Sequence, residues 1–570
     1  MTKPACSRFV VLAAVATFAA VAASNAGAQS FRAVWADAFS VGFKSNAQIT
    51  DLVNRAVAGR YNAIIAEVLA FHDNVGSGHG AYWTSNIVPE ATDVSGGIDP
   101  LAQLIAVAHA ANIEVHAWIV PYRVSSVWPP SGNALVAAHP EWLMVDQASA
   151  GGGPDTVGSY FTLDPGSPES QEYLVSIVRE LVTNYQIDGI NLDYIRYVQT
   201  NAGYPADNSY QNSSLARFRR QTGFVGTPPP TGNTAWNDFR RQTIDEYVKR
   251  LRAEIPSIPN VRQPLRLTGD LICFGNAPAS FTSSDAYILH QNWQLWMQRG
   301  WLDAGIPMNY KRDHVANEAT WYRNWVNAAM SWRYNRHMFA GQGNYLNTKA
   351  NSVAQMAYAV GQGTHGQVNF SYDATADDNT NGTPETDWTW YPYVATNLFT
   401  STTPTPTMPW RNAATATEGT LWGRVTNSST GLPVENATVT AAGQPAVQTD
   451  GNGYYVITLL PAGVSGTAYN VTASSAASGC PNLTANGVLV PRGGIVRRDI
   501  GMCPPAIQPG DMDQDGDIDI ADLNSFFFCM QGPAFTYPLG QFCLRGDADA
   551  NRTVDLADFV NFQENFAQVP

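Results

Sequence analysis

The chain has few charged residues for its length. Only 14% of its 570 residues are Asp, Glu, Lys or Arg, and the 33 basic residues are outnumbered by 47 acidic ones. A protein that binds the phosphate backbone of nucleic acid needs a basic face, so no nucleic-acid partner is predicted. Trp, Tyr and Phe make up 11% of the chain, a balance typical of an exported globular protein that meets neutral ligands.

Long apolar runs are missing after the first thirty residues, so no transmembrane segment is predicted. Lys3 and Arg8 precede a short apolar run, Phe9–Ala23, and Ala26-Gly27-Ala28 has the small-x-small form of a cleavage site. We therefore expect residues 1–28 to be a signal peptide. The mature chain is expected to be secreted, or to reside at the cell surface or in the periplasm.

Cysteine is also scarce, with six in the whole chain, and Cys6 would leave with the signal peptide. Cys480 and Cys503 flank the end of one expected domain, and Cys529 and Cys543 lie between two acidic loops near the carboxyl end. In an oxidising compartment, these four residues are expected to form the disulfides 480–503 and 529–543. Cys273 is left over as a buried strand residue. The nine histidines show no metal-ligand spacing, so no zinc site is expected.

Two acidic loops near the carboxyl end place oxygen side chains at loop positions 1, 3, 5, 9 and 12, as a calcium ion requires. From residue 509 onward, eleven acidic and two basic residues give this segment −9 of the chain's net charge of −14. Calcium is the one cofactor expected, and catalysis is expected to need none. The ligands predicted for the first loop are Asp511, Asp513, Asp515, Asp519 and Asp522, and for the second loop Asp547, Asp549, Asn551, Asp555 and Asp558.

Each loop carries an apolar residue at position 8, Ile518 or Val554, and runs into Asp522-Leu523 or Asp558-Phe559. This duplicated loop-plus-helix pattern resembles the dockerin module. The resemblance implies a small helical domain over residues 511–570, after a linker at 504–510, and a cohesin-like protein as partner. The second loop has Arg552 at position 6 in place of glycine, so Arg552 is expected to adopt a strained turn conformation there.

Strand-like and helix-like segments alternate over residues 29–400. Such alternation predicts parallel strands in a (β/α)8 barrel with insertions, and an open doubly wound sheet is the alternative. No glycine-rich phosphate turn supports the open sheet. Strands are expected at 31–39, 61–69, 113–120, 189–195, 265–273, 304–310, 337–345 and 366–372, and helices include 48–58, 101–111 and 171–185.

Composition changes at residues 401–414, a Thr/Pro-rich stretch expected to be an extended, semi-rigid linker. Residues 415–503 then contain several short strand patterns, including 431–439 (GLPVENATV) and 449–463 (TDGNGYYVITLLPAG). This segment resembles the carboxypeptidase regulatory-like β-sandwich. The resemblance implies an all-β spacer domain between the barrel and the dockerin-like end.

One strand of the expected barrel ends in a carboxylate, in residues 188–197 (DGINLDYIRY). A buried strand rarely ends in a carboxylate unless something charged or reactive meets it, and barrel active sites lie at the carboxyl ends of the strands. With RAVWAD in the first strand and HAWIVPYR after the third, this phrase resembles the glycosyl-hydrolase-like ten family over Phe31 to Phe399. The resemblance implies a (β/α)8 barrel distantly related to the α-amylase group.

In amylase-type enzymes, the fourth strand ends Gly-x-Arg-x-Asp and the Asp is the nucleophile, which implies that role for Asp193. Asn191 stands where the Arg belongs, and Arg196 or Arg123 would have to replace it. Glycoside hydrolysis needs a second carboxyl group. The candidates for the acid are Asp270, near the end of the fifth strand, and then Glu67 on the second, with Asp37 and Asp73 behind them.

Sugar rings are expected to stack on aromatic side chains close to these carboxylates. The residues predicted to bind substrate are Trp83, Tyr122, Arg123, Asn191, Tyr194 and Arg196. The sequence thus predicts a secreted glycosidase that hydrolyses O-glycosidic bonds of a polysaccharide or cell-wall glycan and is anchored through the dockerin-like module. The alternative is a non-catalytic carbohydrate-binding or surface-display protein whose barrel cleft has degenerated.

Overall fold

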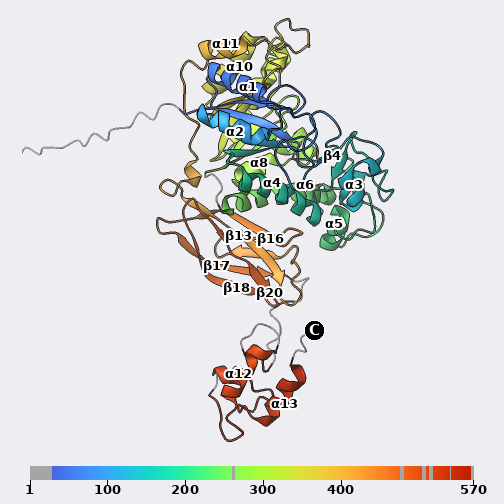
Figure 1. The fold of residues 1–570 in the computed structure, drawn as a ribbon, viewed down its shortest axis with the longest axis vertical. Helices are drawn as coiled ribbons and strands as arrows, with labels where there is room; N and C mark the ends of the chain where they lie inside the picture. Colours follow the sequence, from blue (N-terminus) through green and yellow to red (C-terminus); the bar gives the residue numbers. More distant parts are fainter. Residues whose placement is uncertain are drawn as a thin grey trace, which may run out of the picture.

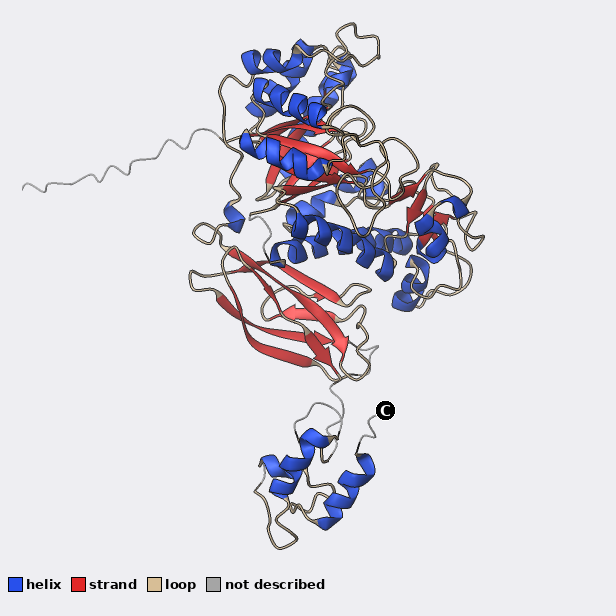
Figure 2. Ribbon diagram, viewed as in Figure 1, coloured by secondary structure: helices blue, strands red, loops and turns tan. Residues whose placement is uncertain are grey.

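The computed structural model describes residues 29–259, 264–475, 480–503, 509–512, 518–538 and 541–566. Three bodies follow one another along the chain: a barrel surrounded by helices, a β-sandwich and a small helical module (Figures 1 and 2). The predicted signal peptide, 1–28, and the predicted linker residues 504–508 lie outside the described residues. No helix in the described ranges is long and apolar enough to cross a bilayer.

Eight parallel strands form a closed barrel in the order β1-β12-β11-β10-β9-β7-β3-β2, so the (β/α)8 prediction is confirmed and the open sheet is wrong. Each observed strand falls within a predicted one, because each is a buried apolar run ended by turn residues. The bounds are β1 Phe31–Ala36, β2 Ala63–Leu69, β3 Glu114–Ile119, β7 Gly189–Leu192, β9 Arg266–Leu271, β10 Ala304–Pro307, β11 His337–Gly343 and β12 Gly366–Phe370.

Alternate side chains of these strands divide the core into two layers, as the period of two in a strand requires. In β1, Ala33 and Trp35 belong to the cluster inside the barrel, while Val34 and Ala36 pack outward with the helices. Gly189 begins β7 where an added Cβ would lie 2.1 Å from the Nδ1 atom of His116, so only glycine fits there.

Helices cover the barrel on its outer side (Figure 1). The helix α4 shows why they form: Ser167 caps it, Pro168 occupies its first turn, and an apolar stripe that includes Leu174 and Leu181 is buried. The helices are α1 Asn46–Ala58, α2 Pro100–Ala110, α4 Pro168–Asn184, α6 Thr234–Glu254, α7 Asp285–Ile288, α8 Trp293–Gln298, α9 Ala316–Trp332, α10 Lys349–Gly361 and α11 Trp390–Asn397.

A small antiparallel sheet in the order β4-β6-β5-β8 is built from two parts of the chain. Strands β4, β5 and β6 belong to an insertion between the third barrel strand and α4, and β8 lies between the fourth barrel strand and α6. The strands of this sheet have only three or four residues, too few to leave a clear pattern in the sequence. The insertion starts directly after the third barrel strand and therefore lies beside the barrel mouth. The elements of both parts are β4 Arg123–Ser125, α3 Ala134–Ala138, β5 Leu143–Asp146, β6 Phe161–Leu163 and β8 Ala202–Pro205, followed by α5 Ser214–Thr222.

The segment between barrel and sandwich is docked on the barrel. Thr405 donates its hydroxyl to Glu114 (2.5 Å), and the carbonyl of Pro406 accepts from Arg266 (2.6 Å). Trp410 and Arg411 both donate to the fully buried carboxylate of Asp303, at 2.7 Å and 2.8 Å. The Thr/Pro segment therefore fixes the sandwich to the barrel rather than holding it at a distance.

The sandwich has two four-stranded sheets, β16-β13-β19 with β20 beside β13, and β15-β14-β17-β18. It packs on α5 and α6 of the barrel, where Arg217 and Arg220 of α5 pair with Glu435 and Trp422 lies against Ala253 of α6. A further ion pair joins Glu418 to Arg336, which directly precedes β11. The strands are β13 Glu418–Asn427, β14 Thr438–Ala441, β15 Val447–Gln448, β16 Tyr454–Pro461, β17 Thr467–Ser474, β18 Leu483–Val490, β19 Ile495–Arg497 and β20 Ile500–Met502.

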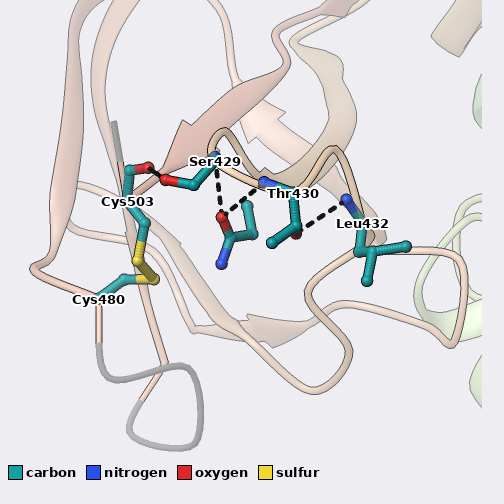
Figure 3. The surroundings of a disulfide bond; sticks show 6 residues. Ser429, Thr430, Leu432, Cys480 and Cys503 are labelled. Carbon is teal, nitrogen blue, oxygen red and sulfur yellow. Dashed lines mark hydrogen bonds between the residues drawn. A yellow bond between two sulfur atoms is a disulfide. The ribbon is translucent and has the colours of Figure 1, made fainter. Parts of the chain in front are cut away.

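Both predicted disulfides are present. Cys480 pairs with Cys503 at the end of the sandwich, where the hydroxyl of Ser429 donates to the Cys503 carbonyl (Figure 3). Cys529 pairs with Cys543 in the helical module. Cys273 is a free cysteine and is buried as expected, but it lies two residues beyond the end of β9 rather than in the strand.

The helical module contains α12 Ile520–Cys529 and α13 Leu556–Asn565, packed around a small core that includes Phe526, Val554 and Phe562. Each helix begins with a capping box, Asp519 with Asp522 and Asp555 with Asp558, so the two halves repeat one another in structure as in sequence.

Candidate active site

Three predicted carboxyl groups meet in one cavity at the carboxyl ends of the barrel strands. Glu67 projects from β2, Asp193 follows β7, and Asp270 lies in β9, the fifth barrel strand. All three side chains are buried, and they line a cavity of 360 Å³ together with Asp37 and Arg123. Three of the predicted candidates for the second carboxyl group, Asp270, Glu67 and Asp37, therefore lie in the same cavity.

Asp270 is held by a chain of hydrogen bonds that runs across two strands. The hydroxyl of Thr268 donates to Asn191 Oδ1 (2.6 Å), and Asn191 Nδ2 donates to Asp270 Oδ2 (2.7 Å). Asn191, at the position where the amylase pattern has Arg, thus orients a carboxyl group instead of providing a positive charge. Burial raises the pKa of Asp270 well above its ordinary value, and the negative charge of nearby Asp193 raises it further.

Asp193 differs from Asp270 in its electrostatic surroundings, because two arginines lie close to Asp193. Burial raises the pKa of Asp193, but Arg196 and Arg123 favour the ionised form, and the backbone N–H of Tyr194 donates to Asp193 Oδ1 at 2.6 Å. These two arginines therefore supply the charge that Asn191 cannot. Asp193 ionises more readily than Asp270, because Asp270 faces two carboxylates, Asp193 and Glu67.

Glu67 is the third carboxyl group of the cavity. Burial raises its pKa to about 8, the charges of Asp37 and Asp193 act in the same direction, and the backbone N–H of Ala38 opposes them with a 2.9 Å hydrogen bond to Oε2. At neutral pH, Glu67 is therefore mostly protonated and able to donate a proton.

Tyr194 has the strained backbone conformation that often marks functional sites. Its φ is 48°, in the region that side chains other than glycine rarely adopt. The Tyr194 ring lines the cavity, and the guanidinium groups of Arg123 and Arg196 lie 4.2 Å and 4.1 Å from its centroid. The strained turn thus places one ring against both arginines beside Asp193.

Two predicted sugar contacts are corrected by the structure. Trp83 is buried and donates its indole N–H to Glu180 on α4 (2.9 Å), and Tyr122 is buried against Tyr247. Neither ring lines the cavity, because Trp83 is packed towards α4 and Tyr122 towards α6. Of the other predicted residues, Arg123 and Tyr194 line the cavity, while Asn191 and Arg196 act on its carboxyl groups.

Six apolar and aromatic side chains form the rest of the cavity wall. Three of them, Trp35, Trp118 and Phe370, lie in barrel strands, so strand alternation was the signal that would have found those three. The indole N–H groups of Trp118 and Trp35 lie close to Asp193 and Asp270 and favour their ionised forms. The six are Trp35, Phe39, Trp118, Met308, Tyr310 and Phe370.

The predicted calcium ligands are described only in part. Asp513 and Asp515 lie outside the described residues, and Asp511 and Asp522 are buried. In the second loop, Asp547, Asp549 and Asp558 each place a carboxylate oxygen within 4.8 Å of the others. Arg552 has a φ of 69°, as expected, and its backbone N–H donates to Asp547 Oδ2 (2.7 Å).

A (β/α)8 barrel with paired carboxyl groups in a cavity at the carboxyl ends of its strands is the arrangement of a glycosidase-type protein. The sequence matches the family model described as Glycosyl hydrolase-like 10 over residues 30–359, which is more than half of the chain. The chain belongs to this family. Residues 420–502 match the model described as Carboxypeptidase regulatory-like domain, the part that forms the sandwich.

Curated relatives include the glycosyl hydrolase DigH of Escherichia coli strain K12, 27% identical over 244 residues, which are 40% of this chain and 52% of DigH. The glycosyl hydrolase YngK of Bacillus subtilis strain 168 is 24% identical over 335 residues, 53% of this chain and 59% of YngK. The chain thus spans little more than half the length of these relatives.

Among solved structures, the catalytic domain of the β-amylase from Paenibacillus polymyxa is similar, with 12% identity and a TM-score of 0.45. The alignment covers 66% of this chain and 100% of that domain. These values add nothing to the family assignment.

Proposed function

We propose that the protein is a glycosidase that hydrolyses O-glycosidic bonds in a polysaccharide or cell-wall glycan. The observation that carries the proposal is the convergence of Asp193, Asp270 and Glu67 in one cavity lined with aromatic rings. One ionised and one protonated carboxyl group is the pair that glycoside hydrolysis needs. The different surroundings of the three groups provide that division.

In this mechanism, Asp193 is the ionised partner that attacks the sugar or activates water. Arg196 and Arg123 keep its charge available. The protonated partner donates its proton to the leaving oxygen, and two groups fit this role. Asp270 is the first, because Asn191 orients it and the negative charges of Asp193 and Glu67 raise its pKa, which favours the protonated form. Glu67 is the second, with a pKa of about 8.

The two candidate acids are distinguished by the leaving group. We expect Asp270→Asn to lower kcat on natural glycans by about 10²-fold or more, and on activated aryl glycosides much less, because an acid matters most for a poor leaving group. Glu67→Gln serves as the matched variant. If Glu67→Gln shows that dependence instead, and also loses the fall in activity above about pH 8, Glu67 is the acid. Kinetics of both variants on both substrate types give the answer.

Screening the purified protein against a panel of glycans, with peptidoglycan strands included, tests the proposal as a whole. Release of new reducing ends from one glycan class, lost in Asp193→Asn, is the expected result. Binding without release would favour the alternative, a non-catalytic carbohydrate-binding or surface-display protein. The replacement of the amylase-type Arg by Asn191 is the observation that favours this alternative.

We also propose that the chain is exported and that its helical module binds calcium and a cohesin-like protein. The apolar run at 9–23 supports export, and two disulfides suit an oxidising compartment. The cluster of Asp547, Asp549 and Asp558 supports calcium, because its oxygen ligands are those that Ca²⁺ prefers. Burial and the charges of Asp558 and Asp549 raise the pKa of Asp547, so a cation would relieve repulsion there.

Calcium is expected to raise the melting temperature of the helical module and to leave that of the barrel unchanged. The module has a small core, so ion binding would supply much of its folding free energy. Calorimetry of the whole chain with calcium or with a chelator measures this. Asp547→Asn with Asp549→Asn should reduce the increase, whereas Glu564→Gln on α13 should not. No response at millimolar calcium would contradict the dockerin resemblance.

A further inference from the structure

The insertion after the third barrel strand carries one strongly exposed tryptophan, which the site described above does not use. Trp128 is 62% exposed, and its ring stacks on the buried ring of Phe161 with centroids 5.8 Å apart and planes 12° apart. One face of the indole is therefore fixed against the protein, while the other face is open to solvent.

This ring is joined to the cavity by a short stretch of sheet. Strand β4 begins at Arg123, which lines the cavity, and pairs Arg123 with Thr162 and Ser125 with Phe161 of β6. Trp128 is five positions after Arg123, so their Cα atoms lie at most about 17 Å apart. The same small sheet thus positions a cavity residue and the ring that backs Trp128.

Two of the aromatic rings that line the cavity are also exposed to solvent. Phe39 and Tyr194 both line it, and they are 50% and 37% exposed, so the apolar surface continues outward from the carboxyl groups. Beyond them, the guanidinium of Arg123 lies 4.6 Å from the ring of Tyr160, the residue next to Phe161. Rings therefore occur from the cavity rim to the base of Trp128.

We propose that Trp128 is a distal sugar-binding platform of the same site, and that the ligand is a glycan chain long enough to reach it from the cavity. This inference rests on the proposed function, because it takes the cavity as the place where the glycan is bound. A flat indole face binds the apolar face of a sugar ring well. Around the ring, Ser126 and Ser131 are polar and exposed, while Val127, Pro129 and Pro130 are apolar and at least partly exposed. The apolar surface there is confined to one short segment and lacks the breadth of a typical protein-binding patch.

Binding titrations with oligosaccharide ladders test this proposal. The probes are chitin-derived and starch-derived oligosaccharides, from disaccharide to hexasaccharide, titrated into the full chain carrying Asp193→Asn so that turnover does not interfere. We expect affinity to rise with length in one ladder. Adding Trp128→Ala should weaken hexasaccharide binding about ten-fold and leave disaccharide binding unchanged, and Trp128→Phe should restore most of the loss.

Tyr334→Ala is the control. Tyr334 is also exposed, but it lies before β11, at the opposite end of the barrel from the cavity, and its loss should change neither affinity. Hexasaccharide binding unaffected by Trp128→Ala, or equal losses for short and long probes, would overturn the proposal. The proposal would also be overturned if affinity did not rise with oligosaccharide length, or if neither the chitin-derived nor the starch-derived oligosaccharides were bound. Because this experiment measures binding and not turnover, its result does not depend on whether the barrel is catalytically active. A barrel without activity would contradict the proposed function but not the role of Trp128.

Discussion

Asp193→Asn is expected to lower kcat by at least about 10²- to 10³-fold and to leave the fold intact. The substitution keeps the size of the side chain and its contact with the N–H of Tyr194, but it removes the charge that attacks the sugar or activates water. It also leaves Arg196 and Arg123 without that carboxylate. Initial rates on the glycan identified in the panel, together with the melting temperature, measure both parts of the expectation.

The matched control is Asp207→Asn, in an exposed loop where the carboxylate only accepts from Ser209. This variant should keep the wild-type rate. Activity close to wild type in Asp193→Asn would remove Asp193 from the mechanism and leave Glu67 and Asp270 as the catalytic pair to be examined.

Asp303→Asn is expected to destabilise the protein by about 3–5 kcal/mol, the usual cost of leaving buried charges without a partner. Asp303 is fully buried, and its carboxylate accepts from Arg411, Arg252 and Trp410. Burial alone would raise its pKa, but the two guanidinium groups hold the pKa well below its usual range. Denaturant titration of the whole chain, followed by tryptophan fluorescence, gives the change in unfolding free energy.

The stabilisation that Asp303 provides should decrease as the pH falls. Because the pKa of Asp303 is lower in the folded state, its stabilisation is fully present above about pH 4 and is lost as the pH falls towards the folded-state pKa. The advantage of wild type over Asp303→Asn should therefore shrink on acidification. Asp238→Asn breaks a surface pair with Arg241, in which the Asp side chain is 59% exposed, and should cost no more than about 1 kcal/mol. Equal effects of the two substitutions would contradict the assigned role of Asp303.

The barrel strands could be predicted from the sequence because each is a local, apolar run bounded by turn residues. The small sheet of the insertion could not, since strands such as β4 and β6 contain three residues and gain their stability from pairing with each other. The Thr/Pro segment was predicted to be extended, but its docking depends on Asp303, more than a hundred residues earlier in the chain.

The candidate site shows the same division between local and long-range information. The position of Asp193, Asp270 and Glu67 at the barrel mouth could be predicted because the end of a barrel strand is a local feature. The burial of Trp83 and Tyr122 could not, because it depends on Glu180 and Tyr247, which lie about a hundred residues or more further along the chain. That both Arg123 and Arg196 supply the charge missing at Asn191 is likewise a fact of three-dimensional arrangement.

The docking of the sandwich on the barrel determines where the chain leaves the first two bodies. Cys503 lies beside Ser429, and the neighbouring Thr430 and Leu432 share a surface groove with Arg220 of α5. The exit point therefore sits next to α5, which follows the insertion that bears Trp128. A partner bound to the helical module would therefore be connected to the barrel and sandwich at Cys503, on the side of α5. The fold of the first two bodies thus sets the side of the molecule from which an anchored chain would be held.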